Sequence, residues 1–177
     1  MFDNIVPNDV IIAFFPCVRF EEKIMLGFRG ELYGMQSWDD EKKLRYSMKL
    51  NEEQNDLYQL ISKMVIVVLR KGLRMIIENP YGVQHYLVKY FPIKSKIIDK
   101  DRSKNGDYRK KPTQYWFIGC EPEQNFIFEP IAATKNFTNN GYKVSDLGCN
   151  RTVGRSMIHP QYARRFIKMY LTDGEFV

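Results

Sequence analysis

An apolar run that ends in a proline and a cysteine, Val10–Phe15 followed by Pro16 and Cys17, limits most strongly what this chain can fold into. An uninterrupted run of this length is typical of a strand covered on both faces, as in a parallel sheet. Pro16 ends such a strand because proline has no N–H to donate to the ladder. In open parallel sheets the chemistry takes place outside the carboxyl ends of the strands, and Cys17 would lie there.

A second apolar stretch ends in a similar way. Leu73–Ile77 has the composition of a strand and leads directly into Glu78 and Asn79. Between the two strands, Asp39–Lys71 is the clearest helical region, and within it apolar residues at helical spacing predict a helix over Asn51–Lys71, whose first residue would be its cap. Strand, helix and strand make a βαβ crossover with parallel strands. We therefore expect the Cys17 thiol and the Glu78 carboxyl at the same edge of one sheet.

The rest of the chain carries weaker signals. Segment 20–38 fits either a broken helix or a loop over the cysteine, and its periodicity does not decide. Together with the two strands and their helix, the remaining elements predict an α/β fold with a mostly parallel sheet and flanking helices. These elements are a short helix over Tyr81–Phe91, a short strand at Ile97–Ile98, an exposed loop over Asp99–Pro112, a strand over Thr113–Cys120, a strand piece at Phe126–Phe128, a loop over Ala132–Leu147 and a helix over Pro160–Leu171.

Length and composition favour a single domain over residues 1–177. An apolar fraction of 44% excludes general disorder. The longest apolar run, Met64–Leu69, is too short to span a bilayer, and the N-terminus lacks a signal-peptide pattern, so we expect no membrane partner. The three cysteines are widely spaced and indicate neither a disulfide framework nor a zinc site. Free thiols fit a cytoplasmic protein.

The formal net charge of +6 points towards a nucleic-acid partner. Part of the excess lies in a basic, insert-like loop around residues 94–112, which includes Arg109, Lys110 and Lys111. These three residues and Arg19 are the candidate nucleic-acid contacts. A solvated charged surface is the alternative for the basic loop, because charge runs usually have that role.

The residue types at the two strand ends suggest covalent chemistry. A thiol directly after a strand, with the positive charge of Arg19 nearby, is a candidate nucleophile. Glu78 would be the proton donor or hydrogen-bond partner of that reaction. The alternative is a buried cysteine with a structural role. No spacing pairs Cys17 with His85 or His159, for which surface or core roles are favoured.

These residues resemble a known family. Phe15–Cys17 and Glu78–Pro80, each at the end of an apolar strand and in that order, resemble the Pro-Cys and Glu-Asn motifs of DNA cytosine-5 methyltransferases. Ile77–Val83 and Lys111–Phe117 are similar to segments of small phage-borne members. Arg155–Ala163 is similar to the family's last motif, which leads into a C-terminal helix.

The resemblance implies a truncated Rossmann-like fold of the S-adenosylmethionine-dependent methyltransferase type. Cys17 would add to C6 of a flipped-out cytosine, and Glu78 would engage the ring at N3 and the amino group. The methyl group would come from S-adenosylmethionine, and Pro16 and Asn79 would shape the two turns beside it. DNA would be held by a basic surface, in the cytoplasm of a bacterial or phage-infected host cell.

The chain also departs from the family pattern. Its strand at Val10 corresponds to the family's fourth strand, so the glycine turn and acidic residue that bind the cofactor have no counterpart, and the cofactor pocket is incomplete. Phe15 and Val18 replace the usual proline and glutamine. A sheet cut in this way exposes an edge, and we expect a second chain or a homodimer to complete it.

Three hypotheses therefore stand. The first is that the chain is a cytosine-5 methyltransferase-like protein, either as a complete enzyme or as part of a split or truncated one. Alternatively, it is a non-catalytic phage-type accessory or anti-defence protein that binds DNA or protein on the same scaffold. The third hypothesis is a plain α/β domain whose Cys17 is structural.

Overall fold

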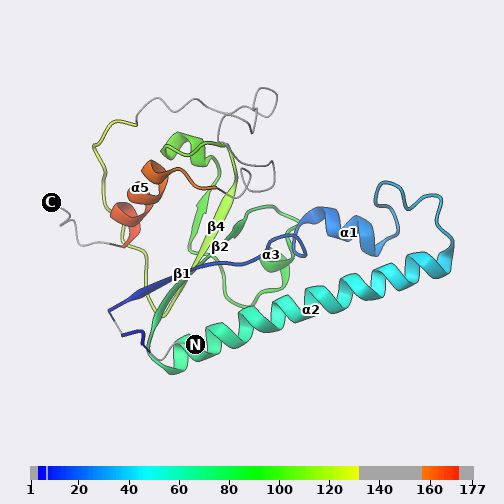
Figure 1. Ribbon diagram of the computed structural model, residues 1–177. Coiled ribbons are helices and arrows are strands. Elements are labelled where there is room, and N and C mark those ends of the chain that lie inside the picture. The colour runs from blue at the N-terminus through cyan, green and yellow to red at the C-terminus, as the bar shows by residue number, and fades with distance from the viewer. Residues whose placement is uncertain (1–3, 7, 132–156, 172–177) are drawn as a thin grey trace. The chain divides into compact units, whose positions relative to one another are not determined.

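The computed structural model describes residues 4–6, 8–131 and 157–171, which belong to two compact units. One unit comprises Met1–Ile98 and Gln114–Glu121, and the other comprises Asp99–Thr113 and Pro122–Val177. The prediction that the chain is a single domain stays a prediction. The elements, shown in Figure 1, are β1 (Val10–Phe14), α1 (Glu22–Phe28), α2 (Asp40–Arg70), β2 (Arg74–Pro80), α3 (Tyr86–Tyr90), β3 (Ile97–Asp99), the 3₁₀ turn η1 (Arg102–Asn105), β4 (Thr113–Ile118) and α5 (Pro160–Tyr170).

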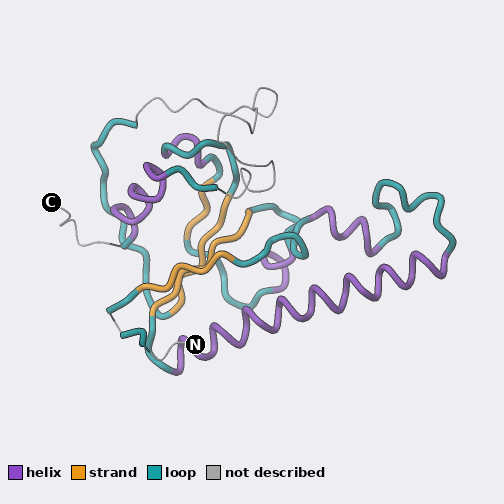
Figure 2. The backbone as a smooth tube through the Cα atoms, in the orientation of Figure 1, coloured by secondary structure: helices purple, strands orange, loops and turns teal. Residues whose placement is uncertain are grey.

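The four strands form one sheet in the order β1-β2-β4-β3. Figure 2 shows the strands in orange. The structure confirms the α/β class and the parallel pairing of β1 with β2, in which Phe14 lies opposite Glu78. The sheet as a whole is mixed and mostly antiparallel, so the prediction of a mostly parallel sheet is wrong. Parallel neighbours need a long crossover, and α2 supplies one between β1 and β2. The connection from β3 to β4 contains the 3₁₀ turn η1 but no α-helical crossover, so it does not impose a parallel pairing on these neighbours.

The first strand is less buried than its sequence predicts. Ile11 and Ala13 pack against the hydrophobic core, whereas Ile12 is 41% exposed and Phe14 is 59% exposed. Successive side chains of a strand point to opposite faces of the sheet, so one face of β1 is bare. The prediction of a strand covered on both faces is therefore wrong, because the core covers only the face that carries Ile11 and Ala13. β1 also lies at the edge of the sheet.

The long helix α2 occupies the whole predicted helical region and therefore begins before Asn51, the predicted cap. Asp39 is its N-cap, and the side chain of Asp39 accepts a hydrogen bond from the backbone N–H of Lys42 at 2.7 Å. Asn51, the predicted cap, lies inside the helix with its side chain exposed. The C-terminal end agrees with the prediction: α2 ends at Arg70, and Gly72 adopts a positive φ of 64°.

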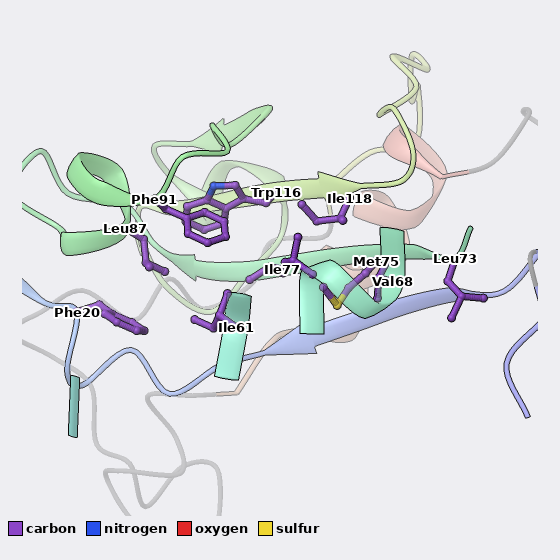
Figure 3. Packing of buried hydrophobic residues seen from close by; sticks show 11 residues of the cluster. Phe20, Ile61, Val68, Leu73, Met75, Ile77, Leu87, Phe91, Trp116 and Ile118 are labelled. Atoms are coloured by element: carbon purple, nitrogen blue, oxygen red, sulfur yellow. The ribbon is translucent and has the colours of Figure 1, made fainter. Parts of the chain in front are cut away.

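The hydrophobic core of the first unit lies between α2 and the sheet (Figure 3). Apolar side chains from one face of α2 meet residues that alternate along β2 and β4, and burial of such side chains is the main term that stabilises a fold of this kind. These residues are Ile61, Val65 and Val68 of α2, Met75 and Ile77 of β2, and Trp116 and Ile118 of β4. Phe20, Leu87 and Phe91 extend the same cluster towards the end of β2 at which the candidate site lies.

The strand β4 stops two residues before its predicted end. Gly119 adopts a positive φ of 70° and passes close to the backbone of Leu73. A Cβ atom at this position would lie 2.2 Å from the Leu73 carbonyl oxygen, so only glycine fits there. The chain therefore leaves the ladder after Ile118.

In the second unit, α5 confirms the predicted C-terminal helix, with Pro160 in its first turn. The predicted strand piece at Phe126–Phe128 is wrong, since no strand is formed there. The residues just before it bond to the helix instead: the backbone N–H groups of Glu123 and Asn125 donate to the carbonyls of Tyr170 and Met169. The loop predicted over residues 132–147 lies outside the described residues.

Candidate functional site

The parallel pairing of β1 and β2 brings the two predicted motifs to one edge of the sheet. Because Phe14 lies opposite Glu78, the Pro16-Cys17 turn and the Glu78-Asn79 turn leave the sheet at the same end. Pro16 is exposed and Cys17 is partly buried. The structure thus groups four residues that were chosen from the sequence as catalytic or cofactor-binding: Pro16, Cys17, Glu78 and Asn79.

Asn79 connects the Glu78-Asn79 turn to the Pro16-Cys17 turn by a hydrogen bond. Its side chain is fully buried, and its Nδ2 donates a hydrogen bond to the Phe15 carbonyl oxygen at 3.3 Å. From the other side, Gln114 Nε2 donates to the carbonyl oxygen of Pro80 at 2.8 Å. The second polar atom of the Asn79 amide, Oδ1, is buried without a hydrogen-bond partner. A buried acceptor without a partner costs free energy unless a ligand or solvent satisfies it.

Glu78 is a buried carboxylic acid, with 6% of its surface exposed. Met75 and Ile77 face the core beside α2, so strand alternation places Glu78 on the opposite face of the sheet. On that face its register partner Phe14 is largely exposed. The buried carboxyl group therefore lies next to the exposed part of this face, which begins at Phe14.

The Cys17 thiol has a partner that the sequence analysis did not identify. Its Sγ donates a hydrogen bond to Glu21 Oε1 at 3.2 Å. The backbone carbonyl of Cys17 accepts from the N–H groups of Phe20 and Glu21, which closes a turn and brings residues 17 and 21 together. The only sequence signal for this contact is the spacing of four residues between Cys17 and Glu21. That spacing predicts a contact only if the chain turns immediately after the strand.

The candidate nucleic-acid contacts fall into two groups. Arg19 lies in the cysteine turn, but its Nε forms an ion pair with Glu53 of α2. Arg109, Lys110 and Lys111 belong to the second unit, in which Lys110 is exposed. The structure thus places Arg19 beside the candidate site, and the role of all four residues in binding nucleic acid stays a prediction.

A cavity of about 320 Å³ lies next to the chain that follows Asn79. Tyr81, Leu87, Gln114 and Trp116 contribute to its wall, and Gln114 is the residue that holds Pro80. A cavity of this size is within the range of small-molecule sites. A ligand bound in it would contact the segment that continues from the Glu78-Asn79 turn.

His85 is a second neighbour of the cysteine turn that the sequence analysis did not place there. The ring is 3% exposed, its two nitrogens have no hydrogen-bond partner, and its centroid lies 6.2 Å from that of Phe20. Burial lowers the pKa of His85 from 6.5 to about 4, and the charge of Glu21 opposes this shift. The imidazole is therefore neutral at pH 7. His159, in contrast, caps α5 by accepting from the Gln161 N–H at 3.0 Å.

The buried His85 predicts a pH dependence of stability. The unfolded chain takes up a proton on His85 as the pH falls through 6.5, whereas the folded chain does so only near 4. The contribution of the neutral His85 to the free energy of unfolding is therefore fully present above pH 6.5. It is lost as the pH falls from 6.5 to about 4. Between about pH 7.5 and about pH 5 we expect the His85 contribution to lower the free energy of unfolding by about 2 kcal/mol.

Urea unfolding of the wild type and of His85→Gln at the two pH values measures this contribution. The variant lacks the titrating group, so the difference between the two pH slopes isolates His85 from the carboxylates that also titrate. The same pH slope in both proteins would contradict the prediction.

Among the described residues, no group of three His, Cys, Asp or Glu side chains is arranged to hold a metal ion. None of the helices in the described parts of the chain is both long and apolar enough to cross a membrane. Comparison of the chain with family models, with curated proteins and with solved structures finds no match.

Proposed function

We propose that this chain is a DNA cytosine-5 methyltransferase-like protein, as a complete, split or truncated enzyme. The observation that carries the proposal is the parallel register of β1 and β2, which brings Cys17 and Glu78 to one edge of the sheet. The hydrogen bond from Asn79 to the Phe15 carbonyl supports it, because it fixes one turn against the other. A nucleophile and an acid held by adjacent strand ends are the groups that addition to a pyrimidine ring requires.

In this proposal each residue of the site has one role. The Cys17 thiol forms a bond to C6 of a cytosine that has been turned out of the duplex. Glu78 holds the ring edge at N3 and the amino group, and its burial strengthens that hydrogen bond. Addition at C6 makes C5 electron-rich, so C5 becomes able to take an electrophile.

S-adenosylmethionine is the methyl donor of this proposal and supplies an electrophilic methyl group when bound. The unpartnered Oδ1 of Asn79 fits a role in that site, since it is a buried acceptor at the edge where the ligand would lie. Pro16 borders the same edge. We propose that a second chain, or a second copy of this chain, pairs with β1 and completes the pocket, because β1 lies at the end of the strand order.

Exchange of the C5 hydrogen of cytosine for deuterium tests the proposal without the methyl donor. Reversible addition of the thiol at C6 lets C5 take up a deuteron from D2O, and elimination then restores the ring. We expect the purified chain to label cytosine in a duplex of mixed sequence above a protein-free control, as measured by mass spectrometry of the nucleosides. Calorimetric titration with S-adenosylmethionine, with and without duplex, reports separately on the cofactor pocket.

A non-catalytic binding protein on this scaffold is the second candidate function. The bare face of β1, with Ile12 and Phe14 exposed, favours it because such a surface suits a protein partner. Duplex or protein binding without deuterium exchange would support this candidate and contradict the methyltransferase proposal.

A further inference from the structure

The Cys17 thiol is held by a carboxylate from its own turn. Cys17 Sγ lies 3.2 Å from Glu21 Oε1, a distance suited to a hydrogen bond from sulfur. The carbonyl of Cys17 accepts from the N–H of Phe20 at 2.8 Å and from the N–H of Glu21 at 3.2 Å. The hydrogen bond between the two side chains is therefore supported by the backbone of the turn.

Contacts with three elements fix this turn in the first unit. Before it, the Phe15 carbonyl is bonded to Asn79 of β2. In its middle, the Arg19 carbonyl accepts from Gln54 Nε2 of α2 at 2.8 Å. At its end, Phe20 is fully buried, and its carbonyl accepts from the N–H of Tyr86 of α3 at 2.9 Å. The separation of thiol and carboxylate is thus set by the fold.

The charged groups around the turn determine what Glu21 does to the thiol. They are Arg19, Glu22 and Lys23 on the same segment, Glu53 on α2, Glu78 on β2 and His85 before α3. The positive charge of Arg19 is paired with Glu53. His85 is neutral at pH 7 because burial lowers its pKa to about 4. The Glu21 carboxylate therefore acts on the thiol as a negative charge, which disfavours the thiolate.

We infer that Glu21 is a catalytic residue that keeps the Cys17 thiol protonated and oriented in the resting protein, and that accepts the thiol proton when sulfur adds to the pyrimidine ring. The inference rests on the proposed function. The family motifs quoted above do not include this position.

The addition step uses only the Cys17 thiol, the Glu21 carboxylate, the pyrimidine ring and solvent. The S–H bond breaks and its proton passes to the Glu21 carboxylate, while a sulfur electron pair forms the S–C6 bond. The π pair of C5=C6 moves towards C5, which takes a deuteron from the solvent in the exchange assay. Loss of the original C5 proton to solvent restores C5=C6 and expels sulfur, which recovers its proton from Glu21.

Glu21→Gln separates the hydrogen bond that Glu21 accepts from the thiol from the effect of its negative charge. The amide keeps a hydrogen-bond acceptor and removes the charge. We expect the pKa of the Cys17 thiol, measured from the pH dependence of iodoacetamide alkylation, to fall by about one unit. Peptide mass spectrometry assigns the alkylation to Cys17, and Cys120 serves as an internal reference. Glu22→Gln is the matched control, since it removes a neighbouring exposed carboxylate and should leave the Cys17 profile unchanged.

In Glu21→Gln the lower thiol pKa should make alkylation by iodoacetamide faster, whereas deuterium exchange at C5 should become slower. Without a proton acceptor, Glu21→Gln should exchange roughly 10²-fold more slowly than the wild type and than Glu22→Gln. A thiol that is more reactive towards iodoacetamide but slower towards cytosine is a result that mere disruption of the turn would not produce.

The two assays fail in distinguishable ways. An unchanged Cys17 alkylation profile in Glu21→Gln would overturn the inference even if the wild type exchanges deuterium. If the profile shifts but the wild type does not exchange, the proposed function is contradicted, and the proton-accepting role of Glu21 is overturned with it.

Discussion

Replacing Cys17 with alanine is expected to abolish deuterium exchange at C5 of cytosine. The thiol is the nucleophile of the proposed reaction, and the methyl group of alanine cannot form the covalent bond to C6. We expect a loss of roughly 10⁴-fold or more, as is typical when a nucleophile is removed. Glu78→Gln should lower the rate by roughly 10²- to 10⁴-fold, because the amide cannot donate a proton to the ring as an acid does.

Cys120→Ala is the matched control for the Cys17 variant. Cys120 is also a partly buried free thiol, but burial raises its pKa and its Sγ donates to the Ile118 carbonyl at 3.7 Å. Its replacement should leave exchange unchanged. Circular dichroism and duplex binding of all three variants separate loss of chemistry from loss of fold. Full exchange by Cys17→Ala would rule out the covalent mechanism.

Asp107→Asn is expected to destabilise the second unit strongly. Asp107 and Arg102 form an ion pair in which both side chains are at most 2% exposed. The asparagine keeps an oxygen that can accept from the N–H groups of Tyr108 and His159, as Asp107 Oδ1 does at 2.8 and 2.9 Å. It removes the negative charge of the pair and puts an NH2 donor in place of the Oδ2 that faces the Arg102 guanidinium, and arginine cannot lose its proton to escape burial.

An uncompensated buried charge costs about 3–5 kcal/mol. The guanidinium of Arg102 lies 4.6 Å from the centroid of the Tyr162 ring, a cation–π contact that offsets only part of this cost. Hydrogen exchange of the α5 backbone amides in urea measures the effect, because Tyr162 belongs to α5 and the readout is specific to this unit.

Two further variants make the Asp107 prediction falsifiable. Glu129→Gln removes the carboxylate of an exposed ion pair with Lys168 on α5 and should change protection little. The double variant with Arg102→Met removes both buried charges and should regain part of the lost stability. A cost for Asp107→Asn as small as that of Glu129→Gln would contradict the prediction.

Part of the candidate site could be predicted from sequence because it depends on local patterns. The apolar run before Pro16, the apolar run before Glu78 and the helical periodicity between them are each read over a few residues. A crossover through a helix makes the two strands parallel, which is the pairing that the structure has. The meeting of Cys17 and Glu78 at one edge follows from that pairing.

The neighbours of the site could not be predicted in this way. Glu21 reaches Cys17 only because the chain turns at once after β1, and His85 approaches that turn through contacts between distant segments. The Arg102–Asp107 pair likewise depends on how η1 and the following loop fold together. Burial and pairing of a polar side chain are properties of its surroundings, which a single stretch of sequence does not contain.

The sequence by itself determined the α/β class, the parallel β1–β2 pair, the end of α2 before Gly72 and the helix α5 after Pro160. Each of these depends on short-range periodicity, on a cap or on the missing N–H of proline. Only the tertiary structure decided that the sheet is mostly antiparallel and that β1 is an edge strand with one exposed face. Those features depend on which distant segments compete for the same strand edge or apolar surface, and that competition is resolved only when the whole chain packs.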